Sequence, residues 1–238
     1  MSGRIAYYGG IVKDGLVLDL DAGKKDSYNR VGTSWNDISG NGNNGTLTNF
    51  GSQTTYDSNN AGSIVFDGLD DCVILQNFIT SSYNSLTFNF WIKSITQKSY
   101  HQSILGKDTN TVNLPHLLIR RFANSDTLSY NVNNGISNDV IQVTDFFTGY
   151  DNIWLNIQIT ANYNTGDFIF YRNGQFFFQR NITSIFPNTN AVIYLGAFVN
   201  PGFLPFYGNI SIVSLYNRVL SASEVLQNYN ATKGRYDL

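Results

Sequence analysis

Strict alternation of apolar and polar residues is the feature that most limits what this sequence can fold into. In Leu86–Lys93, L-T-F-N-F-W-I-K, every second residue is a large apolar one. In Ile153–Thr160, I-W-L-N-I-Q-I-T, aliphatic residues alternate with Trp, Asn, Gln and Thr. A period of two places the first set on one face of a β-strand and the second set on the other. The pattern predicts sheets with one face buried in a core and the other face more exposed to water. The buried face would include Ile153 and Leu155.

Many other short runs have strand character, and turns rich in Asn, Gly, Ser and Asp separate them. They are Leu16–Leu20, Ser63–Phe66, Cys72–Leu75, Leu117–Phe122, Leu128–Val132, Val140–Val143, Phe168–Arg172, Phe176–Gln179, Val192–Leu195 and Asn209–Tyr216. Short strands at such spacing predict an all-β sandwich or barrel. The pair Asn173-Gly174 between two of these runs predicts a tight hairpin, because both residue types tolerate positive φ.

A single helix is predicted near the end of the chain, in S-A-S-E-V-L-Q-N-Y. Ser221 followed three residues later by Glu224 forms a capping-box pattern, in which each side chain bonds the other residue's backbone amide. Val225, Leu226 and Tyr229 would then form a short apolar stripe.

Charge and hydropathy exclude several functions. Charged residues make up 13% of the chain, the net charge is −2, and no basic stripe is present, so nucleic-acid binding is not expected. The sequence begins without the apolar core of a signal peptide and has no apolar run of about 18 residues, so we expect no membrane insertion. The lone Cys72 lies in an apolar run and is expected to be a buried, inert thiol.

Residues for catalysis are scarce, and we predict that the protein is not an enzyme. Glu224 is the only Glu, and the capping box already accounts for it. His101 and His116 are isolated, and the adjacent Asp70 and Asp71 would point in different directions. A glycosidase needs two facing carboxylates, and an Asp-only pair stays open as an alternative.

Two groups of Asp residues could hold calcium. Asp19 and Asp21 share one side of a predicted strand, and Asp67, Asp70 and Asp71 surround a turn. Oxygen-only clusters suit Ca²⁺. The preferred interpretation is that these carboxylates accept backbone N–H bonds at turns, as Asp commonly does. We therefore expect no cofactor, with calcium kept as the alternative.

The stretch Trp35–Phe50, W-N-D-I-S-G-N-G-N-N-G-T-L-T-N-F, begins like a calcium loop. Counted from Asp37, however, position twelve is Thr48, where an EF-hand needs a bidentate Glu. Apolar residues punctuate the stretch, and Asp37 and Ser39 are placed to bond the amides that follow them. We predict a rigid rim loop.

Ordered motifs carry a family resemblance from about Gly15 to Tyr229. They include G-L-V-L-D-L-D-A-G, W-N-D-I-S-G-N-G-N-N-G-T-L, S-I-V-F-D-G-L-D-D, Y-R-N-G-Q and G-N-I-S-I-V-S-L-Y-N-R-V-L-S-A-S-E-V-L-Q-N-Y. The chain resembles the concanavalin A-like, laminin-G-like (LamG-type) jelly-roll domain. The resemblance implies a two-sheet antiparallel jelly-roll sandwich with one short C-terminal helix, formed by residues 15–238 as a single domain. Residues 1–14 would be an N-terminal arm.

The resemblance also bears on function. Family members bind glycans, proteins or lipids, and some hold calcium. Enzymes on this fold use a Glu-x-Asp-x-x-Glu strand, which this chain lacks. Many relatives carry Asp where this sequence has Ser211, and this departure lowers the expectation of a calcium site there.

The Asn-rich ending is similar to LamG-like modules of tailed-bacteriophage virion proteins. It implies a non-enzymatic virion structural protein, a capsid decoration or a tail or fibre component, made in the host cytoplasm and located on the virion. Its partners would be other virion proteins or further copies of itself. Contacts would come from Phe198–Tyr207, in particular Phe203, Phe206 and Tyr207, unless these aromatic residues simply cap the sandwich.

The alternative function is a carbohydrate-binding module or adhesin that recognises host surface glycans. Sugar sites combine an aromatic ring with a few polar groups that form hydrogen bonds. Trp91, Trp154, Asn89 and Asn156 would offer this chemistry if the wetter faces of their strands are open. The competing interpretation is that both Trp side chains pack under a loop or against the helix.

Overall fold

The structure is a computed structural model that describes residues 9–51, 55–79, 83–95, 99–108, 116–133, 138–183 and 191–238. Antiparallel strands dominate these ranges. The strands are β1 (Leu16–Asp21), β2 (Ser34–Trp35), β3 (Gly45–Thr48), β4 (Tyr56–Asp57), β5 (Ser63–Asp67), β6 (Cys72–Leu75), β7 (Ser85–Ser94), β8 (Gln102–Lys107), β9 (His116–Arg121), β10 (Leu128–Asn133), β11 (Asn138–Val143), β12 (Leu155–Asn162), β13 (Asp167–Arg172), β14 (Gln175–Asn181), β15 (Ile193–Leu195) and β16 (Tyr207–Tyr216). The helices are α1 (Ala222–Thr232) and the short 3-10 turns Asn59–Ala61 and Lys233–Arg235.

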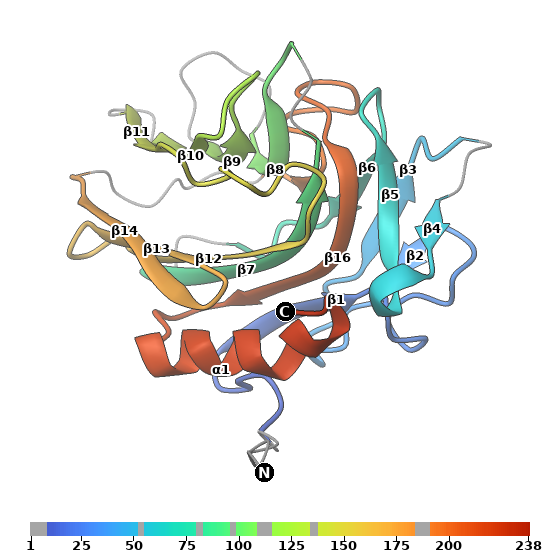
Figure 1. The fold of residues 1–238 in the computed structure, drawn as a ribbon, viewed down its shortest axis with the longest axis horizontal. Helices are drawn as coiled ribbons and strands as arrows, with labels where there is room; N and C mark the ends of the chain where they lie inside the picture. Colours follow the sequence, from blue (N-terminus) through green and yellow to red (C-terminus); the bar gives the residue numbers. More distant parts are fainter. Residues whose placement is uncertain are drawn as a thin grey trace.

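The strands form two sheets that pack face to face (Figure 1). Sheet A has the order β14-β13-β12-β7-β16-β5-β4, and β1 also pairs with β16. Sheet B has the order β11-β10-β9-β8-β15-β6-β3-β2. Figure 1 shows α1 on the face of sheet A that points away from sheet B. The predicted jelly-roll sandwich with one short C-terminal helix is confirmed.

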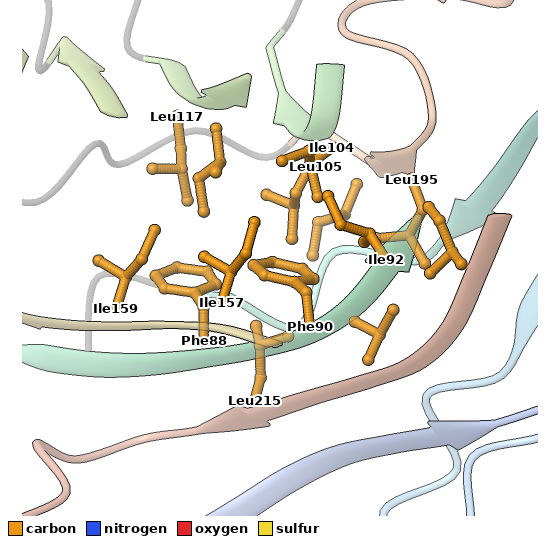
Figure 2. Close-up of a cluster of buried hydrophobic side chains, with 14 of the residues drawn as sticks. Phe88, Phe90, Ile92, Ile104, Leu105, Leu117, Ile157, Ile159, Leu195 and Leu215 are labelled. Carbon is orange, nitrogen blue, oxygen red and sulfur yellow. The ribbon is translucent and has the colours of Figure 1, made fainter. Parts of the chain in front are cut away.

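The core fills the space between the two sheets. Figure 2 shows Phe88 and Phe90 of β7 beside Ile157 of β12, with side chains of sheet B facing them. These residues are the apolar half of the alternation, so the predicted strand faces are confirmed. Ile153 is the exception, because it is 49% exposed and precedes the start of β12. Cys72 is buried as expected, and burial raises the pKa of its thiol to about 12.

The two local patterns at the ends of elements are also confirmed. Ser221 Oγ accepts the Glu224 amide at 3.3 Å, and Glu224 Oε2 accepts the Ser221 amide at 2.8 Å. Asn173 (φ 51°) and Gly174 (φ 71°) join β13 to β14 in the positive-φ turn that the sequence predicts. Within the expected helical stripe, Val225 is buried but Leu226 is 36% exposed, so Leu226 is not part of the packed face.

The helix α1 is the one α-helix in the described ranges. No helix there is long and apolar enough to cross a membrane. Residues 1–8 of the predicted N-terminal arm lie outside the described residues. The described part of the arm lies against the domain, because the Val12 amide donates to Asn228 Oδ1 of α1 at 2.8 Å and Val12 is buried.

The Asn- and Gly-rich loop after Trp35 is organised by one carboxylate. Asp37 accepts the backbone amides of Asp19 (2.9 Å), Ser39 (2.9 Å) and Asn43 (3.0 Å). The Asn43 side chain in turn donates to the Val17 carbonyl at 2.7 Å. These bonds attach the loop to β1, so the calcium-like start of this stretch serves as turn chemistry, as predicted.

Removing the Asp37 carboxylate should destabilise the fold. The Asp37→Ala change leaves three amides without their acceptor, and hydrogen bonds to charged groups stabilise by about 1.5–3 kcal/mol each. Because the three amides are only partly buried and water can replace part of each lost bond, we expect the free energy of unfolding to fall by about 2–4 kcal/mol in urea titrations. Asp26→Ala, at an exposed carboxylate in a nearby loop, is the matched control. A loss in Asp37→Ala no larger than in this control would contradict the assigned role.

Stability at low pH should depend on Glu224. The Arg218 guanidinium lies 2.5 Å from its carboxylate and, with the Ser221 amide, lowers the Glu224 pKa to about 2. Because the folded-state pKa lies below the ordinary value, this stabilisation exists above about pH 4.5 and disappears as the pH falls towards about 2. Between these limits the wild type should lose about 1–2 kcal/mol more stability than Glu224→Gln, given the partial exposure of the pair. Parallel acid-unfolding curves for the two proteins would refute this.

Candidate functional site

The two tryptophans proposed as a sugar platform are buried between sheet A and the C-terminal segment. Trp91 is 0% exposed and Trp154 is 7% exposed. The Trp91 ring stacks on Tyr236 with 3.9 Å between ring centres, and its Nε1 donates to Thr232 Oγ1 at 2.8 Å. Trp154 Nε1 donates to Asn60 Oδ1 at 3.0 Å. The competing interpretation, that both rings pack against the helix or under a loop, is therefore correct.

Polar side chains on the same face of sheet A form a buried polar layer under α1, which comprises Asn89, Asn156, Gln158, Asp19 and Ser214. Asn156 Nδ2 donates to Asn89 Oδ1 at 2.8 Å. Gln158 Nε2 donates to Asn156 Oδ1 and to the Val225 carbonyl, both at 2.9 Å. All five side chains are at most 2% exposed. The expectation that Asn89 and Asn156 line an open glycan site is corrected, because the helix covers this face.

The Asp19–Asp21 pair points towards the same covered face, since Leu18 and Leu20 between and beside them lie in the core. Asp21 is neutralised by Arg235, whose two terminal nitrogens donate to it at 2.7 and 2.8 Å. Asp19 Oδ1 accepts Ser214 Oγ at 3.1 Å, and burial raises the pKa of Asp19. The two carboxylates thus serve the attachment of the C-terminal segment and the packing of the polar layer.

The Phe198–Tyr207 segment divides into buried and exposed residues. Phe206 is fully buried and packs edge-on against Phe66, with 5.8 Å between ring centres. Phe206 therefore caps the core and is not available to a partner, which corrects that prediction. Tyr207 is half-buried and begins β16. Phe203, in contrast, is 48% exposed at the tip of the segment.

Phe203 contributes to an open cavity of about 580 Å³ at the rim of the sandwich, which we call the rim pocket. The lining comes from the turn after β5, the segment before β8 and the loop before β16. The lining residues are Gly68, Leu69, Asp70, Tyr100, Gly202, Phe203, Leu204 and Pro205. Most are apolar, and Leu69 is 67% exposed. Sequence reasoning missed Leu69 and Tyr100, because only the folded chain brings the three segments together.

Hydrogen bonds hold the walls of the rim pocket in place. Tyr100 Oη donates to the Gly68 carbonyl and joins two of the lining segments. The Ser103 amide of β8 donates to the Leu204 carbonyl at 2.9 Å. Leu204 has φ 55°, a left-handed conformation that is unfavourable for a residue with a side chain and is retained where surrounding structure imposes it. The chain's own hydrogen bonds therefore join the segments that form the pocket walls.

Three carboxylates lie beside the rim pocket. Oxygens of Asp67, Asp70 and Asp71 lie within 4.8 Å of one another, close enough to share a cation. Asp71 Oδ2 accepts the Asp67 amide at 2.9 Å, and Asp67 Oδ1 accepts the Leu69 amide at 2.8 Å. Burial raises the pKa of Asp71 to about 6. The predicted turn chemistry is confirmed for Asp67 and Asp71, and the exposed Asp70 is the carboxylate that lines the pocket.

A second, smaller hollow of about 240 Å³ lies between the edge strands β11 and β14. It is lined by Val140, Ile141, Gln142, Phe178 and Arg180. This hollow has one aromatic ring and no carboxylate in its lining. The rim pocket offers two aromatic rings, an apolar floor and an exposed carboxylate, so it is the stronger candidate for a binding site.

Comparison with solved structures places this geometry on a known fold. The receptor-binding domain of botulinum neurotoxin C/D mosaic serotype is 17% identical, with a TM-score of 0.69 over 92% of this chain and 51% of that chain. The binding domain of Paraclostridial Mosquitocidal Protein 1 is 18% identical, with a TM-score of 0.69 over 92% of this chain and 52% of that chain. The chain thus spans about half the length of these structures, and at this identity the likeness concerns the fold alone.

Sequence comparison gives the family. A search of curated protein sequences found no match. The model of a laminin G family, described as the concanavalin A-like lectin/glucanases superfamily, matches residues 66–226, which is more than half of the chain. This match agrees with the resemblance carried by the sequence motifs and with the two-sheet sandwich. The chain belongs to the concanavalin A-like lectin/glucanases superfamily.

Proposed function

We propose that the protein is a non-enzymatic, glycan-binding module that holds its ligand in the rim pocket. The observation that carries this proposal is the pairing of the Phe203 ring with the Asp70 carboxylate on one open, apolar cavity. A sugar has an apolar C–H face and a ring of hydroxyl groups. An aromatic ring can cover the first, and a carboxylate can accept hydrogen bonds from the second.

Several properties of the rim pocket support a sugar ligand. Its apolar lining, with Leu69 and Phe203 both largely exposed, would lose unfavourable contact with water when a ligand covers it. Its polar groups are few, and in ligand pockets such groups fix orientation. The two similar structures described above are a receptor-binding domain and a binding domain of other proteins, which agrees with a binding role.

A non-enzymatic role fits the carboxylates of the rim pocket. A glycosidase needs one acid and one base or nucleophile on opposite sides of the scissile bond. Asp67 and Asp71 accept backbone amides and so serve the turn, which leaves Asp70 as the exposed member of the cluster. The chain also lacks the Glu-x-Asp-x-x-Glu pattern of enzymes on this fold.

Replacing the exposed ring should weaken binding without affecting folding. In a glycan array followed by calorimetry on the best hit, Phe203→Ala should weaken binding at least tenfold, since it removes the stacking surface. Phe176→Ala is the matched control, because Phe176 is 62% exposed on the distant strand β14. It should bind like the wild type. No binding to any glycan at millimolar concentration would overturn the proposal, and equal affinity of Phe203→Ala would place the site elsewhere.

A second candidate is a structural component of a bacteriophage virion, as a capsid decoration or a tail or fibre protein. Exposed apolar surface also marks protein interfaces, and Leu69 with Phe203 would serve a neighbouring virion protein as well as a sugar. The sequence features behind this candidate are the Asn-rich C-terminal motifs. Mass spectrometry of purified virions should then find the chain at a fixed copy number. Its complete absence from them would exclude this role.

A further inference from the structure

Arg120 on strand β9 differs from the other enclosed arginines of the chain. Arg121, Arg218 and Arg235 each form an ion pair with a carboxylate. Arg172 donates to the carbonyls of residues 145 and 146. Arg120 forms no hydrogen bond and no ion pair with any group in the described ranges, and those ranges contain every Asp and Glu of the sequence. The chain thus supplies an acceptor for each of these guanidinium groups except that of Arg120.

The Arg120 side chain is partly withdrawn from water. Leu117 and Ile119 of β9 point into the core, so by strand alternation Arg120 lies on the outer face of sheet B. Its guanidinium carbon lies 4.9 Å from the centre of the Phe122 ring. The Nε atom of Arg120 is shielded from solvent and has no hydrogen-bond partner. The two terminal nitrogens are not in this buried, unpartnered state. An incoming acceptor would therefore meet the terminal nitrogens, which remain cationic even where burial lowers the arginine pKa.

A second N–H donor, the imidazole of His101, contacts the same Phe122 ring. The His101 ring centre lies 4.5 Å from that of Phe122. His101 Nδ1 accepts the Ala123 amide at 3.1 Å, so the proton of the neutral imidazole is on Nε2. Burial and the nearby charge of Arg120 lower the pKa of His101, so the ring is neutral near pH 7 and Nε2 is a donor. The Arg120 guanidinium carbon and the His101 ring centre thus both lie within 5 Å of the Phe122 ring centre, and neither group donates to a protein acceptor in the described ranges.

We propose that Arg120 and His101 form a binding site for an oxyanion, the carboxylate of an acidic sugar or a sulfate ester. A planar guanidinium presents paired N–H groups that match two oxygens of such an anion. The Phe122 ring orients the guanidinium and keeps water from one of its faces, which strengthens the interaction with an anion. This site is distinct from the rim pocket, which is lined by Asp70 and has no cation in its lining, and it does not depend on the proposed function.

The test uses the two histidines of the chain as probes. The full-length protein is titrated at constant ionic strength with acetate, glucuronate, sulfate or glucose, and the imidazole signals are followed by NMR. We expect saturable shifts of the His101 signals, but not of the His116 signals, with at least one of the three anions and none with glucose. Saturation by acetate and glucuronate assigns a carboxylate ligand, and saturation by sulfate assigns a sulfate ester.

Matched variants separate a built site from general charge attraction. Arg120→Gln should weaken anion binding at least tenfold, and Arg120→Lys should also weaken it because the planar fork is lost. Arg180→Gln removes an exposed arginine of β14 and should bind like the wild type. Circular dichroism checks that each variant is folded. Linear shifts without saturation, equal effects of Arg120→Gln and Arg180→Gln, or unchanged binding in Arg120→Lys would overturn the proposal.

Discussion

The fold depends on how α1 is attached to a polar sheet surface. Core packing between the sheets accounts for one face of sheet A, but the opposite face carries the polar layer of Asn89, Asn156, Gln158, Asp19 and Ser214. Buried polar groups are costly unless they are bonded, and here side-chain amides bond each other and the Val225 carbonyl of the helix. Since a displaced helix would break the bond from Gln158 to the Val225 carbonyl and leave the rest of the layer uncovered, the layer favours one position of α1. It also closes a face that other arrangements would leave open to ligands.

Because α1 covers the polar face of sheet A, the candidate binding surfaces lie at the rim of the sandwich and on sheet B. The rim pocket combines segments that lie far apart in the sequence, and the tie between Tyr100 and Gly68 belongs to its wall. Charged side chains are few in this chain, so the position of each one helps to identify candidate binding surfaces. Asp70 stands at the rim pocket, while Arg120 stands on sheet B without a carboxylate. The two proposed sites would therefore take ligands of different charge.

Local patterns in the sequence predicted most of the fold, and the site much less. Alternation in Leu86–Lys93, the Asn173-Gly174 turn and the Ser221–Glu224 box each depend on neighbouring residues, and each was confirmed. The same alternation was misleading for Trp91, because a polar face looks the same in sequence whether water or a helix covers it. Phe203 was proposed from its aromatic, proline-flanked segment, and it lines the candidate rim pocket. Leu69 and Tyr100 could not be found, since their proximity is a product of the tertiary fold.

The loop bound to Asp37 has a consequence for association between molecules. Among the strands of the described residues, β1 pairs only with β16, so its other edge would expose unpaired backbone groups. There the Asp37 side chain accepts the backbone amide of Asp19. The side-chain amides of Asn41 and Asn43 donate to the backbone carbonyls of Leu16 and Val17, respectively. These side chains imitate the hydrogen bonds of a missing strand. The Asn-rich loop therefore blocks the edge against strands of other chains, a protection that sheet proteins more often obtain from lysine, proline or a bulge.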